Sequence, residues 1–162
     1  MTIEAKTSGP VALLANPWLA LVCRLVVGVV FIYASLDKVA HPAAFAGIVH
    51  NYQILPHSLI NITAILLPWI ELVAGLLLVL GVWTRGSSLI ISVMLIVFIA
   101  AIGYNIYRGL DFICGCFDVT EDGMRIGWTK IGQNIVLLAL SLHALFRSSA
   151  LDLGRVLGPR WR

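Results

Sequence analysis

Residues 59–82, LINITAILLPWIELVAGLLLVLGV, decide what kind of fold this chain has. The stretch contains a single charged side chain, that of Glu71, and is otherwise almost entirely apolar. A helix rises about 1.5 Å per residue, so a run of this length can cross the ~30 Å hydrocarbon layer of a bilayer. The stretch therefore predicts a membrane-spanning helix with a carboxyl group inside it.

Three further apolar runs flank this one, at residues 17–36, 87–107 and 128–146. The 162-residue chain is 60% hydrophobic and 12% charged, whereas a soluble domain is usually about 45–50% apolar and about 25% charged. Four spans use most of the chain and leave no room for a separate soluble domain. We predict an all-α polytopic membrane protein, with a four-transmembrane-helix bundle as a single domain over residues 1–162.

The basic residues predict how the bundle is oriented. The formal net charge is +3, and Arg147, Arg155, Arg160 and Arg162 cluster after the last span, in a tail at residues 147–162. Because short basic segments stay on the cytoplasmic side, both termini are expected in the cytoplasm. The protein itself is expected in the cell inner membrane. Membrane topology explains the positive charge, so the expected partner is the lipid bilayer and no nucleic acid is expected.

The first outer loop follows the first span and contains a short helical segment. Residues 43–52 are expected to form an interfacial helix, since Pro42 suits a first helical turn and Pro56 follows the end. The second outer loop holds the sequence DFICGCFD at 111–118. With the termini inside, both loops face the periplasm.

Cys114 and Cys116 form a Cys-Gly-Cys tripeptide in this second loop. Disulfides form and persist in oxidising compartments, and strained, exposed disulfides tend to be the catalytic ones. The pair is therefore a candidate catalytic thiol–disulfide site. A static disulfide or two idle thiols is the competing interpretation, because Cys-x-Cys alone is a weak motif.

A metal site is a second alternative. His41, His50 and His57 all lie in the first outer loop and could join two thiolates as ligands of copper, zinc or mercury. The histidines lack the spacing of known metal motifs, so no metal ligand is assigned. Cys23 lies inside the first span and is expected to act as a small buried hydrophobe.

Arg24, Glu71 and Asn105 are polar residues inside the predicted spans. An ionisable residue within a membrane is a functional-site hypothesis by default. Arg24 and Glu71 are expected at similar depth, as a structural ion pair or as part of a quinone pocket that includes Asn105. Pro68 is expected to kink the second span near Glu71.

Several short motifs occur in a fixed order along the chain. They are Tyr-x-x-Leu-Pro at 52–56, Leu-Pro-x-x-Glu at 67–71, Asn-x-x-Arg-Gly at 105–109 and Cys-Gly-Cys-Phe at 114–117. With the first span and its exit, RLVVGVVFIYASLDKVAHPAAF at 24–45, they resemble the MauE branch of the MauE/DoxX redox-associated membrane proteins. The resemblance covers about residues 18–146.

This resemblance implies a four-helix membrane fold and a role in maturing methylamine dehydrogenase, whose small subunit carries many disulfides. Carried over by position, it makes Cys114 and Cys116 the redox pair, Phe117 the loop aromatic and Glu71 the intramembrane acid. The chain departs from the usual pattern at Asp118, where the family has glycine. An acid so close to the thiols should disfavour the thiolate.

The predicted function is a membrane thiol–disulfide oxidoreductase. Its pair would accept electrons from a thioredoxin-like or disulfide-rich extracytoplasmic protein, with a membrane quinone as onward acceptor. The quinone step lacks the second cysteine pair that quinone-linked disulfide generators use. The alternatives are a metal-binding or small-solute membrane transporter and a structural subunit of a membrane redox complex.

Overall fold

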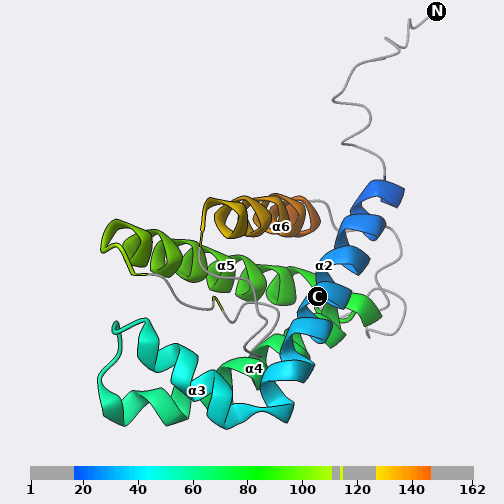
Figure 1. Cartoon of the computed structure of the whole chain (residues 1–162). Helices are drawn as coiled ribbons and strands as arrows, with labels where there is room; N and C mark the ends of the chain where they lie inside the picture. The colour runs from blue at the N-terminus through cyan, green and yellow to red at the C-terminus, as the bar shows by residue number, and fades with distance from the viewer. Residues whose placement is uncertain (1–16, 111–113, 115–126, 147–162) are drawn as a thin grey trace, which may run out of the picture.

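The computed structural model describes residues 17–110, 114 and 127–146 (Figure 1). This part of the chain forms five helices and no strand. The helices are α2 (Pro17–Ala40), α3 (Pro42–Asn51), α4 (His57–Leu80), α5 (Thr84–Tyr107) and α6 (Trp128–Phe146). The prediction of an all-α fold is confirmed. The tail at residues 147–162 lies outside the described residues.

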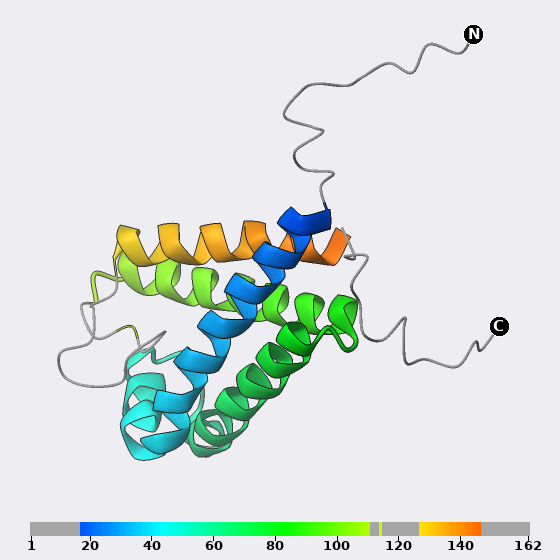
Figure 2. The same cartoon turned by 90° about the vertical axis from the view of Figure 1, so that its right-hand side faces the viewer.

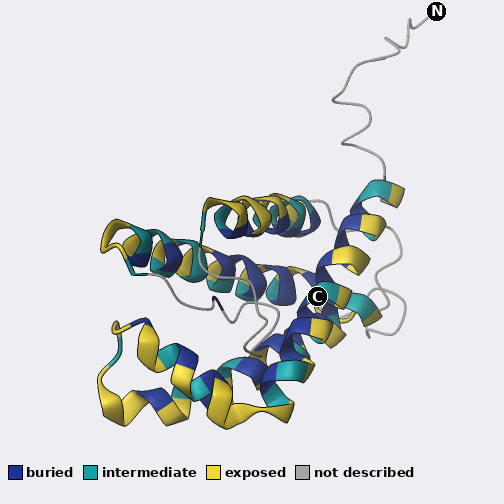
Figure 3. Cartoon of the chain, in the orientation of Figure 1, coloured by how far each residue is buried: buried dark blue, intermediate teal, exposed yellow. Residues whose placement is uncertain are grey.

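Four of the helices, α2, α4, α5 and α6, are long and apolar enough to cross a membrane. Each has a buried stripe and an exposed face (Figure 3), and the exposed faces carry most of the large hydrophobic side chains that a lipid-facing surface needs. The predicted spans match these helices closely. The largest difference is that α2 continues past Leu36 to Ala40 and so includes Lys38, whose side chain is buried.

The spanning helices associate as two pairs. Helix α2 packs along α4, and α5 packs along α6, so that the two pairs cross each other (Figures 1 and 2). The short helix α3 lies against α4 at the end of the bundle where α2 finishes. It occupies the predicted first outer loop and begins at Pro42, one residue before the predicted start.

Two glycines let α2 and α4 approach closely. A Cβ atom added to Gly75 would lie 3.0 Å from the Gly28 carbonyl oxygen and 3.2 Å from the Ile32 backbone nitrogen. A Cβ atom at Gly28 would lie 3.0 Å from the Gly75 oxygen. Small residues at such crossings allow backbones to touch in the absence of a hydrophobic driving force between helices. This contact fixes the register of α2 on α4.

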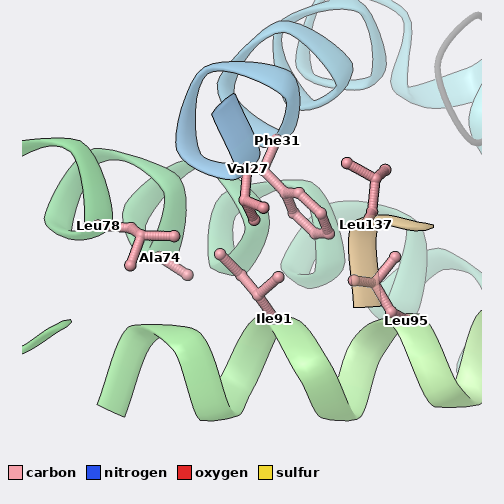
Figure 4. Packing of buried hydrophobic residues seen from close by; sticks show 7 residues of the cluster. All are labelled: Val27, Phe31, Ala74, Leu78, Ile91, Leu95 and Leu137. Carbon is pink, nitrogen blue, oxygen red and sulfur yellow. The ribbon is translucent and has the colours of Figure 1, made fainter. Parts of the chain in front are cut away.

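The centre of the bundle is a cluster of buried apolar side chains from all four spanning helices (Figure 4). Its members are Val27, Phe31, Ala74, Leu78, Ile91, Leu95 and Leu137. Helices α5 and α6 are also joined by hydroxyl groups: Ser141 donates a hydrogen bond to the Ser88 carbonyl at 3.0 Å and lies 3.0 Å from the Ser92 hydroxyl. Such bonds contribute modestly to helix association in membranes.

Candidate functional site

Cys114 lies in a second buried cluster, at the end of the bundle that α3 covers. Its side chain is 1% exposed and is packed with Phe45, Ile48, Tyr52, Ala64 and Ile102. Cys114 is disulfide-bonded in the structure. Its predicted partner in chemistry, Cys116, and the neighbouring Phe117 and Asp118 lie outside the described residues.

Tyr52 holds the backbone at Cys114. Its hydroxyl donates a hydrogen bond to the Cys114 carbonyl oxygen at 3.0 Å and lies 3.7 Å from the Cys114 sulfur. Burial raises the pKa of Tyr52 above its usual value, so the phenol keeps its proton over the physiological range. The tyrosine sits directly after α3, at the start of the Tyr-x-x-Leu-Pro motif, so this motif positions a hydrogen-bond donor on the cysteine loop.

An apolar cavity of about 290 Å³ opens beside Cys114, between α3, α4 and α5. No residue that lines it carries a charge. The lining consists of Phe45, Val49, Tyr52, Ile54, Leu55, Thr63, Leu67, Val93, Met94, Val97, Phe98, Ala101 and Cys114. The buried cysteine therefore borders a hollow that is suited to an uncharged ligand.

Glu71 forms an ion pair with Lys38, not with Arg24. The Lys38 ammonium lies 2.8 Å and 3.0 Å from the two carboxylate oxygens, and both side chains are buried, at 1% and 2% exposure. Because helical side chains tilt toward the N-terminus of their helix, Lys38 reaches back along α2 to the level of Glu71. The predicted Arg24–Glu71 pair is wrong.

Arg24 lies instead at the C-terminal end of α4. Its guanidinium nitrogen would be 2.9 Å from a Cβ atom placed on Gly81, the left-handed residue that ends this helix. A cation is favoured there by the negative end of the helix dipole. Arg24 and Glu71 were expected at similar depth in the membrane. The contact between Gly28 and Gly75 sets a register in which the N-terminal part of α2 extends past the C-terminal end of α4, so Arg24 lies at that end and not beside Glu71.

The ion pair lies directly behind the cavity. The Lys38 ammonium is 5.4 Å from the centre of the Phe45 ring and 5.7 Å from that of Phe98, within cation–π range of both. The same two rings line the cavity. The aromatic wall thus separates a charged pair on one side from an apolar space on the other.

Asn105 and Pro68 both lie inside spanning helices, and neither lines the cavity. The Asn105 amide donates to the Ala101 carbonyl at 2.9 Å on its own helix, and its Oδ1 accepts no hydrogen bond from the described residues. Asn105, Glu71 and Arg24 do not line the cavity beside Cys114. Pro68 is buried inside α4, which continues on both sides of it.

The histidines do not form a cluster with the cysteine. The rings of His50 and His57 lie 4.7 Å apart, while His41 contacts Asp37 at 3.3 Å on the exposed side of α2. Among residues 17–110, 114 and 127–146, no group of three histidine, cysteine or acidic side chains could hold a metal ion. Cys23 is a buried free thiol, as expected of a small core residue.

Three features of the site were not predicted from the sequence. Lys38 lies beyond residue 36, where the first span was expected to end. Tyr52 entered only as the first residue of the Tyr-x-x-Leu-Pro motif, and the cavity depends on how the two helix pairs cross. A signal for Lys38 was present, because a lone acid in a span calls for a buried cation and this lysine lies in the run RLVVGVVFIYASLDKVAHPAAF.

Together, the fold and the site define a class: multi-pass helical membrane proteins with a buried cysteine at one end of the bundle, next to an intramembrane ion pair. The chain belongs to the MauE family, described as methylamine utilisation protein MauE, whose model matches residues 16–147. This match confirms the resemblance that the motifs indicated.

Curated relatives agree with this assignment. The chain is 31% identical to methylamine utilization protein MauE of Paracoccus denitrificans, over 80% of this chain and 69% of that protein. It is 31% identical to the Methylorubrum extorquens protein of the same name, over 91% and 78% of the two chains. The corresponding protein of Paracoccus versutus is 33% identical over 81% and 70%. No solved structure matches the chain.

Proposed function

We propose that this protein is a membrane thiol–disulfide redox protein that uses Cys114 and Cys116 as its exchanging pair. The observation that carries the proposal is the setting of Cys114, which is disulfide-bonded, buried and held by the Tyr52 hydroxyl. A merely structural disulfide would not need an apolar cavity beside one of its sulfurs. The relatives are named methylamine utilization proteins, so we propose that this disulfide exchange takes part in methylamine utilisation.

The two sulfurs would have different tasks. Exchange requires in-line approach of a partner's thiolate to one sulfur, and the 1% exposure of Cys114 leaves no such approach. We therefore assign the contact with a partner to Cys116 and the resolving role to Cys114. The partner would be a thioredoxin-like or disulfide-rich extracytoplasmic protein, met on the periplasmic side of the inner membrane with both termini in the cytoplasm.

Trapping of a mixed disulfide tests this proposal. Membranes that carry Cys114→Ser, alkylated with N-ethylmaleimide, should yield an adduct that disappears on reduction, because Cys116 can bond a partner and no second thiol can release it. Cys116→Ser should trap much less, because its remaining sulfur is buried. The double variant controls for Cys23. Absence of an adduct in both single variants would contradict a redox role and favour a structural subunit.

Orientation is tested separately. An impermeant maleimide added to reduced, intact spheroplasts should label Cys116 and leave Cys23 unlabelled. Labelling of Cys116 only after lysis would place the loop in the cytoplasm, where disulfides rarely persist. The periplasmic assignment would then be wrong, whatever the trapping experiment gives.

A further inference from the structure

We infer that the cavity beside Cys114 is the binding site for the ring of a lipid-borne quinone, which takes electrons from the cysteine pair. The inference rests on the proposed function, because a pair that oxidises a partner must itself be reoxidised. It names the place where this happens. The cavity, its lining and its access from the bilayer carry the argument.

The shape and lining of the cavity suit a ring rather than a whole lipid. Ligand sites are usually about 300–1,000 Å³, mostly apolar and aromatic, with a few polar groups that fix orientation. At about 290 Å³ this cavity is at the small end of that range. Phe45 and Phe98 supply aromatic faces. A long isoprenoid tail would stay in the bilayer while the ring enters.

The cavity can be reached from the lipid. Val93 and Val97 line it from α5, and they are 51% and 60% exposed on the surface of a helix that could span the membrane. Ile54, which lines it from the segment after α3, is 48% exposed. An apolar oxidant dissolved in the bilayer would meet this opening directly, whereas a water-soluble oxidant would have to cross apolar surface.

One polar group in the lining is suited to orient a quinone. The Thr63 hydroxyl makes no hydrogen bond within the described part of the chain, so it can donate to a quinone carbonyl. The Tyr52 hydroxyl is already engaged with the Cys114 carbonyl and keeps the cysteine in place. Thr63 would therefore determine affinity, and Tyr52 would act as a positioning residue.

The redox step balances without any further reactant. The thiols of Cys114 and Cys116 lose two electrons and two protons, and an S–S bond forms between them. The quinone gains the same two electrons and two protons, so that its two carbonyl oxygens become the hydroxyls of a quinol. Burial of Cys114 against the cavity puts one sulfur of the pair next to the oxidant.

Two adjacent alanines on α5 offer a matched test. Ala101 lines the cavity, whereas Ala100 is exposed on the lipid-facing side. Detergent-purified protein is reduced with dithiothreitol, desalted and mixed with decylubiquinone, and quinol formation is followed by absorbance. Wild type should form one quinol per cysteine pair. Ala101→Phe should slow this roughly tenfold or more, since its ring overfills the cavity, and Ala100→Phe should not.

Thr63→Val provides a second variant of nearly unchanged shape. Loss of one hydrogen bond of about 1 kcal/mol should raise the half-saturating decylubiquinone concentration about fivefold. Thermal unfolding in the same detergent shows whether each variant is folded. If Ala101→Phe does not fold, the result for Thr63→Val alone tests the quinone site. Equal rates in all variants, or equal losses in Ala100→Phe and Ala101→Phe, would overturn the inference.

Failure of the inference can be told from failure of the proposed function. If wild type exchanges disulfides with a reduced thioredoxin but forms no quinol, the cavity is not a quinone site and the proposed function stands. If wild type does neither, the proposed function is wrong and the inference falls with it.

Discussion

The two sides of helix α4 are built in opposite ways. Toward α2, a carbon added at Gly75 would lie only 3.0 Å from the Gly28 carbonyl oxygen, and Glu71 forms an ion pair with Lys38 at 2.8 Å. Toward α5 the same helix borders a cavity of about 290 Å³, to which it contributes Thr63 and Leu67. Helix α4 thus has a tightly packed interface with α2 and an interface with α5 that contains a cavity.

This difference indicates that the α2 side of α4 contributes mainly to stability and that the α5 side is the place for a functional site. Voids cost stability, because atoms around them lose van der Waals contacts. A bundle of four helices can carry such a void when a neighbouring interface holds the backbone fixed. We expect mutations on the α2 side to change stability strongly, and mutations on the α5 side to change stability little.

The largest effect should come from the ion pair. Lys38→Met or Glu71→Met leaves one buried charge without its partner, which should lower the free energy of unfolding by about 3–5 kcal/mol. The double variant should recover much of this loss, because no charge then remains. Denaturant titration in detergent measures the three values.

Arg24 provides the control for this cycle. The position of Arg24 against Gly81 puts it ten residues along α4 from Glu71, or about 15 Å. Arg24→Met and Glu71→Met should therefore have additive effects on unfolding free energy. Strong coupling between them, with none between Lys38 and Glu71, would restore the pairing that the sequence suggested.

The glycine contact should have the next largest effect. Gly75→Ala places a methyl group 3.0 Å from the Gly28 carbonyl, so the helices must separate, at a cost of about 1–3 kcal/mol. Gly103→Ala is the matched control on α5, where an added Cβ atom meets nothing within 4 Å. Its better helix propensity should leave stability unchanged or raised. Thermal unfolding of both variants in one detergent compares them.

Tyr52 should have a smaller effect that depends on pH. Tyr52→Phe removes the hydrogen bond to the Cys114 carbonyl and should cost about 0.5–1.5 kcal/mol at neutral pH. Since burial raises the Tyr52 pKa, the folded state holds this proton more tightly than the unfolded state does. The stability that this confers is present below pH ~10 and is lost as pH rises further.

Unfolding titrations between pH 8 and pH 11 check this sign. Wild type should lose stability above pH ~10, and Tyr52→Phe should lose less. Parallel curves for the two proteins would mean that Tyr52 does not cause the alkaline loss.

The smallest effect should come from the hollow side. Ala101→Val adds two carbons next to the cavity, so it should change the free energy of unfolding by less than about 0.5 kcal/mol or raise it slightly. Gly75→Ala adds fewer atoms yet should cost more. A larger loss in Ala101→Val than in Gly75→Ala would break the contrast between the two sides of α4.

The spans could be predicted because length and apolarity alone decide which segments can cross a bilayer. Helix α3 could be placed because Pro42 and Pro56 punctuate the chain around it. The partner of Glu71 could not be predicted, because it depends on the register between α2 and α4. That register is set by contact between Gly28 and Gly75, which hydropathy does not reveal.

The surroundings of Cys114 could not be predicted from the sequence. Cys114 stood out as a thiol in a polar loop, but its burial depends on α3 folding over the end of the bundle. The cavity depends on how α4 and α5 diverge, which results from the packing of all four helices. Neither the burial of Cys114 nor the cavity is encoded in a local pattern of the chain.

The Lys38–Glu71 pair also bears on how the chain enters the membrane. A charged side chain costs about 2.5–3.5 kcal/mol during insertion when it lies at the centre of a span. Glu71 lies well inside α4, whereas Lys38 lies in the last turn of α2, where the cost is smaller. Helix α2 is synthesised before α4, so its lysine has no partner until α4, the next spanning helix, follows. Each relieves the other's penalty once they meet, so biogenesis should favour release of α2 and α4 into the lipid as a hairpin. Such a hairpin would provide a template for α5 and α6.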